Sequence, residues 1–425
     1  MGGCVRDLVL ARTPNDFDIT TSARPEEIKA CFRRTIDTGI RHGTVTVMLE
    51  EQGFEVTTYR VDGAYSDGRH PDEVHFTRSL IDDLKRRDFT INAMAYGETE
   101  GLVDYYGGMR DLQKKVVRCV GRPDERFEED SLRVMRAVRF AAQLGFTIEP
   151  LTAEAAKRHA PQLERVSAER IREELMKLIT SPHPETFGQL YELGITSVIL
   201  PEFDLCMKTE QNTKHHLYNV GVHTVKSMCE ITNSPALRLT MLLHDLGKPM
   251  SRTTDESGTD HFKGHAAKSA RIANEILRRL KFDNNMRKRV VQLVRWHDLR
   301  PKPRPEEVRK AICIIGRELF EDYLAVQWAD NMAKSEYRRD EKLQRIVDVF
   351  NLYREIIKRG DCLSVAELAI DGNDLLELGI KGPAVGEVLK ACLDTVLQDP
   401  GNNNRTFLLE VAKDAARTAG EQPVC

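Results

Sequence analysis

The chain has 425 residues, of which 41% are hydrophobic, enough for several domains with cores of their own. No run approaches the roughly 18 consecutive apolar residues of a membrane span, and the start lacks the pattern of a signal peptide. Nine cysteines without CxxC spacing exclude a disulfide framework and predict reduced thiols in a cytoplasmic protein, while a net charge of −3 still permits a local basic groove for nucleic acid.

The first informative element is a double glycine, Gly2-Gly3, followed by the segment Asn15-Asp16-Phe17-Asp18-Ile19. If this segment is a strand, alternation places Asp16 and Asp18 on one face. Two carboxylates so close repel each other unless a cation lies between them, and Mg²⁺ carrying a phosphate suits such oxygen ligands. The glycines would let backbone N–H groups approach that phosphate. A lone Asp-x-Asp is usually a solvated turn, but this combination indicates metal-dependent nucleotidyl transfer.

Residues 44–49 and 54–61 are β-rich runs that predict strands in an α/β head ending near residue 117. Glu55 in the second run is a third acidic candidate, although a single acid in a strand could equally face solvent. Residues 62–71 are rich in turn formers and predict a mobile loop beside the site. A basic segment then follows where triphosphate contacts are needed: Lys85-Arg86-Arg87-Asp88-Phe89-Thr90-Ile91-Asn92.

From about residue 120 helical periodicity dominates, and a helix is predicted to begin near Glu128. Along it, Glu129, Asp130, Arg133 and Arg136 would share one face. Such a pattern is commonly an ion-paired solvated surface, but this helix is apolar around much of its girth, and buried charge must be satisfied. Cytosine and adenine both present an amino donor beside a ring-nitrogen acceptor. A carboxylate that accepts (Asp130) and a guanidinium that donates (Arg133) complement that pair.

Histidines concentrate between residues 205 and 344 and indicate a separate helical module. It carries His223, the adjacent pair His244-Asp245, and Asp330. An adjacent His-Asp with distant His and Asp partners resembles the HD-domain metal phosphohydrolases, whose dinuclear members recruit further ligands at the places of His265 and His297. Imidazole with carboxylate suits Mn²⁺, iron, Ni²⁺ or Mg²⁺ more than a closed zinc site. The alternative is a core histidine oriented by a carboxylate.

Taken together, the sequence resembles the CCA-adding tRNA nucleotidyltransferases of the bacterial-type class II, within the polymerase-beta-like superfamily. The resemblance covers nearly the whole chain. It is carried by five elements: GGCVRD (2–7), DFD (16–18), RRDFTINAMA (86–95), EEDSLRVMRAVRFAAQLGF (128–146) and AERIREELMKLI (168–179).

This resemblance implies an α+β protein with a head (1–117), a helical neck (118–204), an HD body (205–344) and a helical tail (345–425). The expected partners are tRNA, CTP and ATP, with Mg²⁺ as cofactor and Mn²⁺ or Ni²⁺ as candidates at the HD site. No membrane partner is expected. The implied catalytic residues are Asp16, Asp18 and Glu55, the implied nucleotide-binding residues are Gly3, Arg6, Arg87, Asp130, Arg133 and Arg136, and the implied HD ligands are His223, His244, Asp245 and Asp330.

Three other functions stay open at this point: a bacterial poly(A) polymerase, an enzyme that adds only CC or only A, and an HD phosphohydrolase with an inactive head. The loop before His70 favours full CCA addition. Members of the resembled family carry a helix and a strand before the double glycine, which this chain lacks, so its head sheet is expected to miss one strand.

Overall fold

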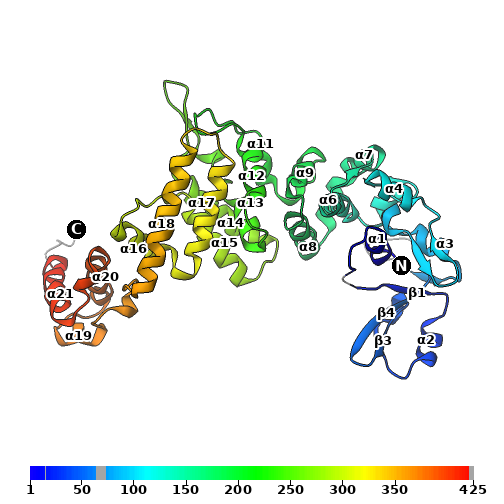
Figure 1. Cartoon of the computed structure of the whole chain (residues 1–425), viewed down its shortest axis with the longest axis horizontal. Helices are drawn as coiled ribbons and strands as arrows, with labels where there is room; N and C mark the ends of the chain where they lie inside the picture. Colours follow the sequence, from blue (N-terminus) through cyan, green and yellow to red (C-terminus); the bar gives the residue numbers. More distant parts are fainter. Residues whose placement is uncertain (15, 64–72, 421–425) are drawn as a thin grey trace. The chain divides into compact units, whose positions relative to one another are not determined.

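The computed structural model describes residues 1–14, 16–63 and 73–420, which divide into two compact units (Figure 1). The first unit comprises Met1–Lys208 with Asn233–Pro235 and Glu275–Asp283. The second comprises Thr209–Thr232, Ala236–Asn274 and the residues from Asn284 onward. The predicted loop at 62–71 lies mostly outside the described residues. In the described part of the chain, no helix is long and apolar enough to cross a membrane.

The head of the first unit is built on a four-stranded sheet of order β1-β4-β3-β2. Strand β1 runs parallel to β4, and the other neighbours are antiparallel. Alternation along the strands places Val45, Val47 and Val56 on one face, where Ile28 packs against them. The strands of this unit are β1 (Ile19–Thr21), β2 (Thr35–Gly39), β3 (Thr44–Leu49), β4 (Gln52–Thr58), β5 (Arg60–Asp62), β6 (Val74–Phe76), β7 (Ala95–Gly97), β8 (Gly101–Val103), β9 (Val116–Val117) and β10 (Thr147–Ile148).

This sheet confirms the predicted α/β head and the strand at residues 44–49. The expectation that Asp16 and Asp18 belong to a strand was wrong, because β1 begins at Ile19. Both aspartates precede the strand and are exposed. Their proximity therefore comes from the chain entering the sheet edge rather than from alternation within a strand. Glu55 does lie in β4, exposed and opposite Thr46 of β3.

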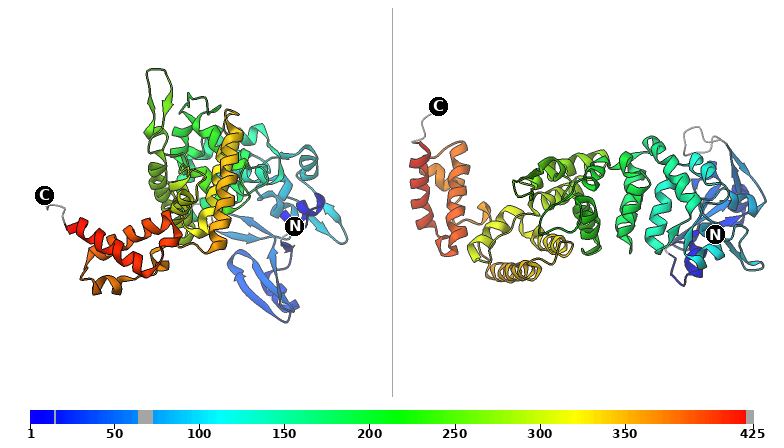
Figure 2. Two further views of the ribbon diagram at one scale, coloured as in Figure 1. Left: turned by 60° about the vertical axis from the view of Figure 1, so that its left-hand side comes forward. Right: turned by 90° about the horizontal axis from the view of Figure 1, so that it is seen from above.

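Helices make up most of the rest of the first unit, and prolines begin several of them. Figure 2 shows the head and these helices from two further sides. The helices are α1 (Gly3–Val9), α2 (Pro25–Cys31), α3 (Leu80–Lys85), α4 (Gly108–Lys114), α5 (Pro123–Glu129), α6 (Arg133–Leu144), α7 (Pro150–His159), α8 (Ala168–Ile179), α9 (Gly188–Glu192), α10 (Thr196–Ile199) and α11 (Pro201–Met207).

The predicted single helix from Glu128 onward is divided in two. Helix α5 ends at Glu129, Asp130 has an extended backbone (φ −145°, ψ 103°), and α6 begins at Arg133. The cause is local: Asp130 Oδ1 accepts a hydrogen bond from the Leu132 N–H at 3.1 Å, so this side chain competes with the helical pattern and opens the next helix. The expectation that the four charged residues share one continuous helix face was therefore wrong.

The second unit is almost entirely helical. Within it, α17 and α18 lie side by side (Figure 1) and a short segment that contains Arg300 joins α15 to α16. The remaining elements of the chain are α12 (Val220–Cys229), α13 (Pro235–Leu243), β11 (Thr253–Thr254), β12 (Asp260–His261), α14 (His265–Arg279), α15 (Asn284–Trp296), α16 (Pro305–Ile315), α17 (Phe320–Met332), α18 (Arg339–Arg359), α19 (Gly372–Glu377), α20 (Pro383–Gln398) and α21 (Arg405–Gly420).

Candidate functional site

A cavity of about 580 Å³ opens in the first unit where α1, the segment before β1, the basic segment and α6 meet. It brings together most of the predicted head residues. Its lining consists of Gly3, Arg6, Asp7, Asp16, Asp18, Arg87, Asp88, Asn92, Arg136, Arg139, Phe140, Gln143 and Lys177.

Each arginine of this cavity has an acidic partner. Arg6 pairs with Asp7 at 2.8 Å. Arg136 pairs with Asp88 at 2.6 Å. In the same way Arg139 pairs with Glu174, and Arg87 faces Asp83 at 3.7 Å. These pairs hold the guanidinium groups in fixed positions along the wall, ready for an anionic ligand.

Phe140 gives this wall an apolar centre. The guanidinium of Arg139 lies 3.7 Å from the ring centroid, and those of Arg6 and Arg136 lie at 5.1 and 5.4 Å. These cation–π contacts stabilise the three guanidinium groups near the ring of Phe140. Phe140 was not among the predicted site residues, and Arg136, four residues before it, was the available signal.

Asp88 is the buried anchor of the cavity. Burial alone would raise its pKa, but the charges of Arg136 and Arg133, with hydrogen bonds from Arg136 and Asn92, hold the pKa of Asp88 well below its usual range. The carboxylate is therefore ionised at neutral pH. It fixes Arg136 through two hydrogen bonds at 2.9 and 2.6 Å.

Asp16 and Asp18 differ from the other acids of the cavity. Both are exposed, and neither side chain makes a hydrogen bond or an ion pair with the described residues. Close backbone approach is visible beside them: Gly2 has φ +79°, and a Cβ there would meet Arg87 Nη1 at 2.5 Å and Asp18 Oδ2 at 3.6 Å. Carboxylate oxygens that are unpaired with the described residues and lie beside a guanidinium group suit a hard cation such as Mg²⁺.

Glu55 does not line the cavity, but β-sheet register relates it to the aspartates. Ile19 of β1 pairs with Val56 of β4, and the two strands are parallel. Asp18, which precedes Ile19, is therefore level with Glu55, which precedes Val56. Among the described residues, the three acids do not bring their oxygens within 4.8 Å of one another as a set.

Asp130 and Arg133, which are predicted to read the base, are already paired with other side chains. Asp130 Oδ2 accepts from Arg170 at 2.7 Å, and Arg133 Nη1 donates to Glu129 Oε2 at 2.5 Å. Arg133 also donates to the Arg86 carbonyl at 3.1 Å. Asp130 and Arg133 do not line the cavity, whereas Arg136, one turn further along α6, does.

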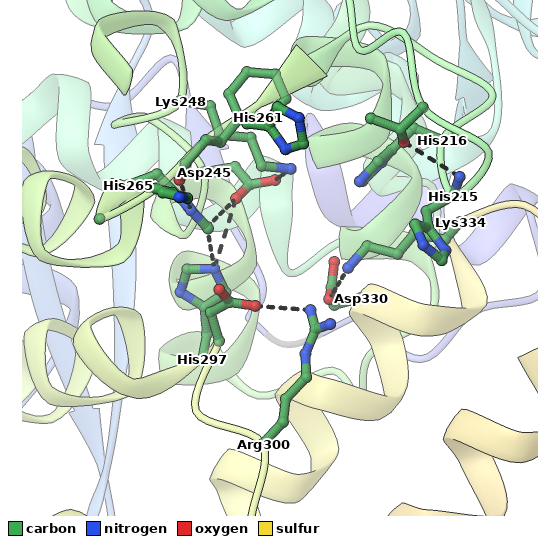
Figure 3. A pocket seen from close by; sticks show the side chains of 15 residues that line it. His215, His216, Asp245, Lys248, His261, His265, His297, Arg300, Asp330 and Lys334 are labelled. Atoms are coloured by element: carbon green, nitrogen blue, oxygen red, sulfur yellow. Dashed lines mark hydrogen bonds and ion pairs between the residues drawn. The ribbon is translucent and has the colours of Figure 1, made fainter. Parts of the chain in front are cut away.

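The second unit contains a buried histidine cluster (Figure 3). Three of its imidazoles are oriented in the same way. His244, His265 and His297 each direct Nδ1 to a backbone carbonyl three residues earlier, at 2.7, 2.8 and 2.7 Å. Because Nδ1 then carries the proton, each Nε2 presents a lone pair to the interior of the cluster.

These three Nε2 atoms and that of His223 converge on Asp245. Its Oδ2 lies 3.2 Å from His244 Nε2 and 3.6 Å from His223 Nε2. Its Oδ1 lies 3.4 Å from His265 Nε2 and 3.6 Å from His297 Nε2. A second carboxylate joins the cluster at His223: Asp330 Oδ1 lies 3.1 Å from His223 Nε2.

The donor set fits one or two divalent ions. Two groups of ligand atoms each lie within 4.8 Å and share Asp245, one with His223 and His244, the other with His265 and His297. Burial lowers the pKa of His223 and of His297, which keeps them in the neutral form that binds metals. The facing Nε2 atoms of His265 and His297, 3.1 Å apart, repel unless a proton or cation lies between them.

A pocket of about 290 Å³ gives access to this cluster and has a mixed, cation-rich lining. Lys248 contacts Asp245 Oδ2 at 2.7 Å, and Lys334 contacts Asp330 Oδ2. Arg300 extends toward the same pocket and pairs with Asp298 (Figure 3). Sequence reasoning missed both lysines, although their i+3 and i+4 spacing from the aspartates was a readable signal.

Models of three protein families match the chain. The poly A polymerase head domain matches residues 1–118, a probable RNA- and SrmB-binding site of polymerase A matches 145–207, and a putative tRNA nucleotidyltransferase domain 2 matches 265–412.

The most similar curated proteins include CCA-adding enzymes of bacteria. The protein from Limosilactobacillus reuteri is 52% identical over 43% of this chain and 46% of its own length, so the chain aligns with about half of that relative. The protein from Enterococcus faecalis is 33% identical over 99% of this chain and 93% of its own length.

Solved structures show the same architecture. The CCA-adding enzyme of Bacillus stearothermophilus in complex with CTP has a TM-score of 0.69 at 29% identity, and covers 99% of this chain and 93% of that one. The Thermotoga maritima enzyme complexed with tRNA shares the fold, with a TM-score of 0.57 at 20% identity over 98% of this chain and 90% of its own. With the full-length relative from Enterococcus, these findings show that the chain belongs to the family of CCA-adding enzymes.

Proposed function

We propose that this chain adds CCA to the 3′ ends of tRNA from CTP and ATP, without a nucleic-acid template, as a class II enzyme in the cytoplasm. The observation that carries the proposal is the cavity of the first unit, where two unpaired aspartates face a row of fixed arginines. Its residues belong to a chain whose relatives are named CCA-adding enzymes. The head, neck, HD body and tail divide at residues 117, 204 and 344, and the tail supplies part of the tRNA contact.

In this proposal Asp16 and Asp18 hold Mg²⁺, with Glu55 as a weaker third acid. Bound there, the metal would activate the 3′-hydroxyl and neutralise charge on the triphosphate. Gly3 and Arg6 bind phosphate oxygens from one side, and Arg87 binds them from the other. The unpaired state of the aspartates supports this assignment, since every arginine of the wall already has its own carboxylate.

Base choice is assigned to Asp130 and Arg133, with Arg136 beside them. The carboxylate accepts from the amino group of cytosine or adenine, and the guanidinium donates to the neighbouring ring nitrogen. Guanine and uracil offer donor and acceptor in another order. Because Asp130 is paired with Arg170 and Arg133 with Glu129, reading a base requires that the Asp130 side chain exchange one partner.

One assay tests the main proposal and separates its rivals. Purified full-length protein is given tRNA that lacks its last three nucleotides, with each labelled triphosphate alone and in mixtures. Three added residues from CTP and ATP are expected. A long A tail identifies a poly(A) polymerase, and arrest after CC or addition of A alone identifies a partial enzyme. No extension at all overturns the proposal.

A second activity is favoured by the histidine cluster. We infer that His223, His244, Asp245 and Asp330 bind Mn²⁺ or Ni²⁺, with His265 and His297 available for a second ion, and that the site hydrolyses phosphate esters at RNA 3′ ends. The convergence of four Nε2 atoms on one buried carboxylate supports metal binding. Metal-dependent phosphate release from 3′-phosphorylated RNA should disappear in H244A and D245A, and release that persists would overturn the assignment.

A further inference from the structure

Both carboxylates of the histidine cluster have a buried lysine on one of their oxygens. Lys248 contacts Asp245 Oδ2 at 2.7 Å, and Lys334 contacts Asp330 Oδ2. Lys334 is only 8% exposed. Placing an ammonium group in such surroundings is costly, so a buried lysine needs a strong partner, and here that partner is a proposed metal ligand.

The two oxygens of Asp330 have different surroundings. Oδ1 faces the imidazoles, 3.1 Å from His223 Nε2 and 3.9 Å from His244 Nε2. Oδ2 is contacted by Lys334. A carboxylate with both oxygens free can bind a cation through one oxygen or through both. With Lys334 in place, only Oδ1 faces the imidazoles.

The lysine is held in place by its own backbone. Lys334 follows α17 directly, four residues after Asp330. Its carbonyl accepts a hydrogen bond from Arg339 Nη2 at 2.6 Å, and the next residue, Ser335, donates its N–H to the His215 carbonyl at 3.0 Å. The ammonium group is therefore directed at Asp330 by a fixed segment rather than by a free surface side chain.

We propose that Lys334 is a positioning residue that reserves Oδ2 of Asp330 and thereby limits this carboxylate to one metal-facing oxygen. This inference rests on the metal site proposed above. Lys334 would weaken metal binding in two ways: its positive charge repels a divalent ion nearby, and the ion has one carboxylate oxygen fewer as a ligand. The bound ion would be held less tightly, and Asp330 lines the same pocket as Arg300 (Figure 3).

A purely structural role predicts the opposite sign. If Lys334 only kept Asp330 in a ligand geometry, its loss would weaken metal binding. If it reserves Oδ2, its loss frees the second oxygen and removes the opposing charge, and metal binding becomes tighter. Metal affinity therefore discriminates between the two roles, whereas a loss of phosphate release alone would not.

The test uses full-length protein freed of metal, with Mn²⁺ as the probe. Calorimetry gives the affinity and electron paramagnetic resonance gives the free Mn²⁺ in the same titration. We expect K334M to bind Mn²⁺ at least about tenfold more tightly than the parent chain. Two other variants complete the set. K342M changes a lysine beside His215 that contacts neither aspartate, and should leave the affinity unchanged. D330N/K334M should bind no more tightly than D330N, because the effect acts through the carboxylate.

The outcomes separate this inference from the proposed site. If the parent chain and H244A bind Mn²⁺ equally, the metal site itself fails. If the parent binds and H244A does not, but K334M binds equally or more weakly, the site stands and the role of Lys334 is overturned. Thermal unfolding with and without Mn²⁺ guards against a misfolded variant: K334M should melt lower than the parent without metal and gain more from its addition.

Discussion

The acids of the head cavity and those of the histidine cluster represent two ways of preparing a metal site. In the cavity, Asp16 and Asp18 are exposed and unpaired with the described residues, and their oxygens do not converge with that of Glu55. In the cluster, Asp245 and four imidazoles are buried, and the Nε2 atom of each imidazole already lies within 3.6 Å of an Asp245 oxygen. The donor atoms of the cluster are already assembled, and those of the cavity are not.

Burial accounts for the difference. Buried polar groups must be satisfied by the fold itself, so the cluster carries its own orienting hydrogen bonds and lysine counter-ions. Exposed carboxylates are satisfied by water and can wait for an ion that enters with a triphosphate. We therefore expect the cluster to bind metal without substrate, and the cavity to bind metal firmly only together with a nucleotide.

The largest effect is expected from D18N. Losing a carboxylate that holds the ion should lower nucleotide addition about a thousandfold, because several kcal/mol of charge stabilisation are removed and each 1.4 kcal/mol is tenfold. Single-turnover extension of tRNA measures this. Mn²⁺ binding at the histidine cluster should not change. A D18N variant that retains more than a tenth of the parent rate would remove Asp18 from the proposed site.

The next largest effect is expected from H244A, which removes one proposed ligand from the histidine cluster only. It should lower the Mn²⁺ affinity of the substrate-free chain about a hundredfold and leave CCA addition within about twofold. Calorimetry and the extension assay together report both effects. A parallel loss of addition would show that the two sites are not independent.

D88N should destabilise the first unit by about 3 kcal/mol, because it leaves Arg136 without its main buried partner. The depressed pKa of Asp88 also fixes the pH dependence. Its stabilisation is present above the ordinary aspartate pKa of about 4 and is lost as the pH falls further. Thermal unfolding of the parent and of D88N should therefore converge in acid; a constant difference down to pH 2 would contradict this.

D130A should relax base choice about tenfold while weakening triphosphate binding less. The ratio of UTP or GTP to CTP incorporation measures this effect. The matched control is R158Q, which breaks an arginine–aspartate pair at Asp124 away from the cavity and should leave the ratio unchanged. Equal loss of incorporation for all four nucleotides would remove Asp130 from base reading.

The smallest effect concerns Lys177, which lines the cavity on α8 and has no acidic partner among the described residues. K177Q should raise the KM for tRNA a few-fold and lower the salt slope of binding by about one, as expected for one phosphate contact. Extension rates at three salt concentrations give both values. K157Q, on the exposed face of α7, is the control. A change in the KM for CTP alone would place the contact on the triphosphate instead.

Much of this architecture could be predicted from residue pattern. The head strand at 44–49 and the helical remainder follow from local periodicity. The four HD residues could be chosen because their types and spacing are distinctive, and they do lie together. Mg²⁺ ligation by Asp16 and Asp18 stays a prediction.

What could not be predicted depends on partners distant in sequence. Asp130 interrupts a helix because its side chain binds a nearby N–H, a choice that helical periodicity cannot reveal. The pairing of Arg136 with Asp88 joins positions 48 residues apart. The spacing of the two lysines suggests a pairing with the aspartates, but it does not reveal that these pairs are buried.

The orienting hydrogen bonds of the histidine cluster have a consequence for its resistance to heat. His244, His265 and His297 each direct Nδ1 to a carbonyl three residues earlier, so local chain geometry sets their tautomers. His223 is the exception: its Nδ1 lies 3.4 Å from the carbonyl of Ala333, 110 positions along the chain. On gradual warming, separation of α12 from the end of α17 would release that one imidazole while its three neighbours stay aligned. The cluster would then come apart in two stages: the group of His223, His244 and Asp245 would open before the group of Asp245, His265 and His297.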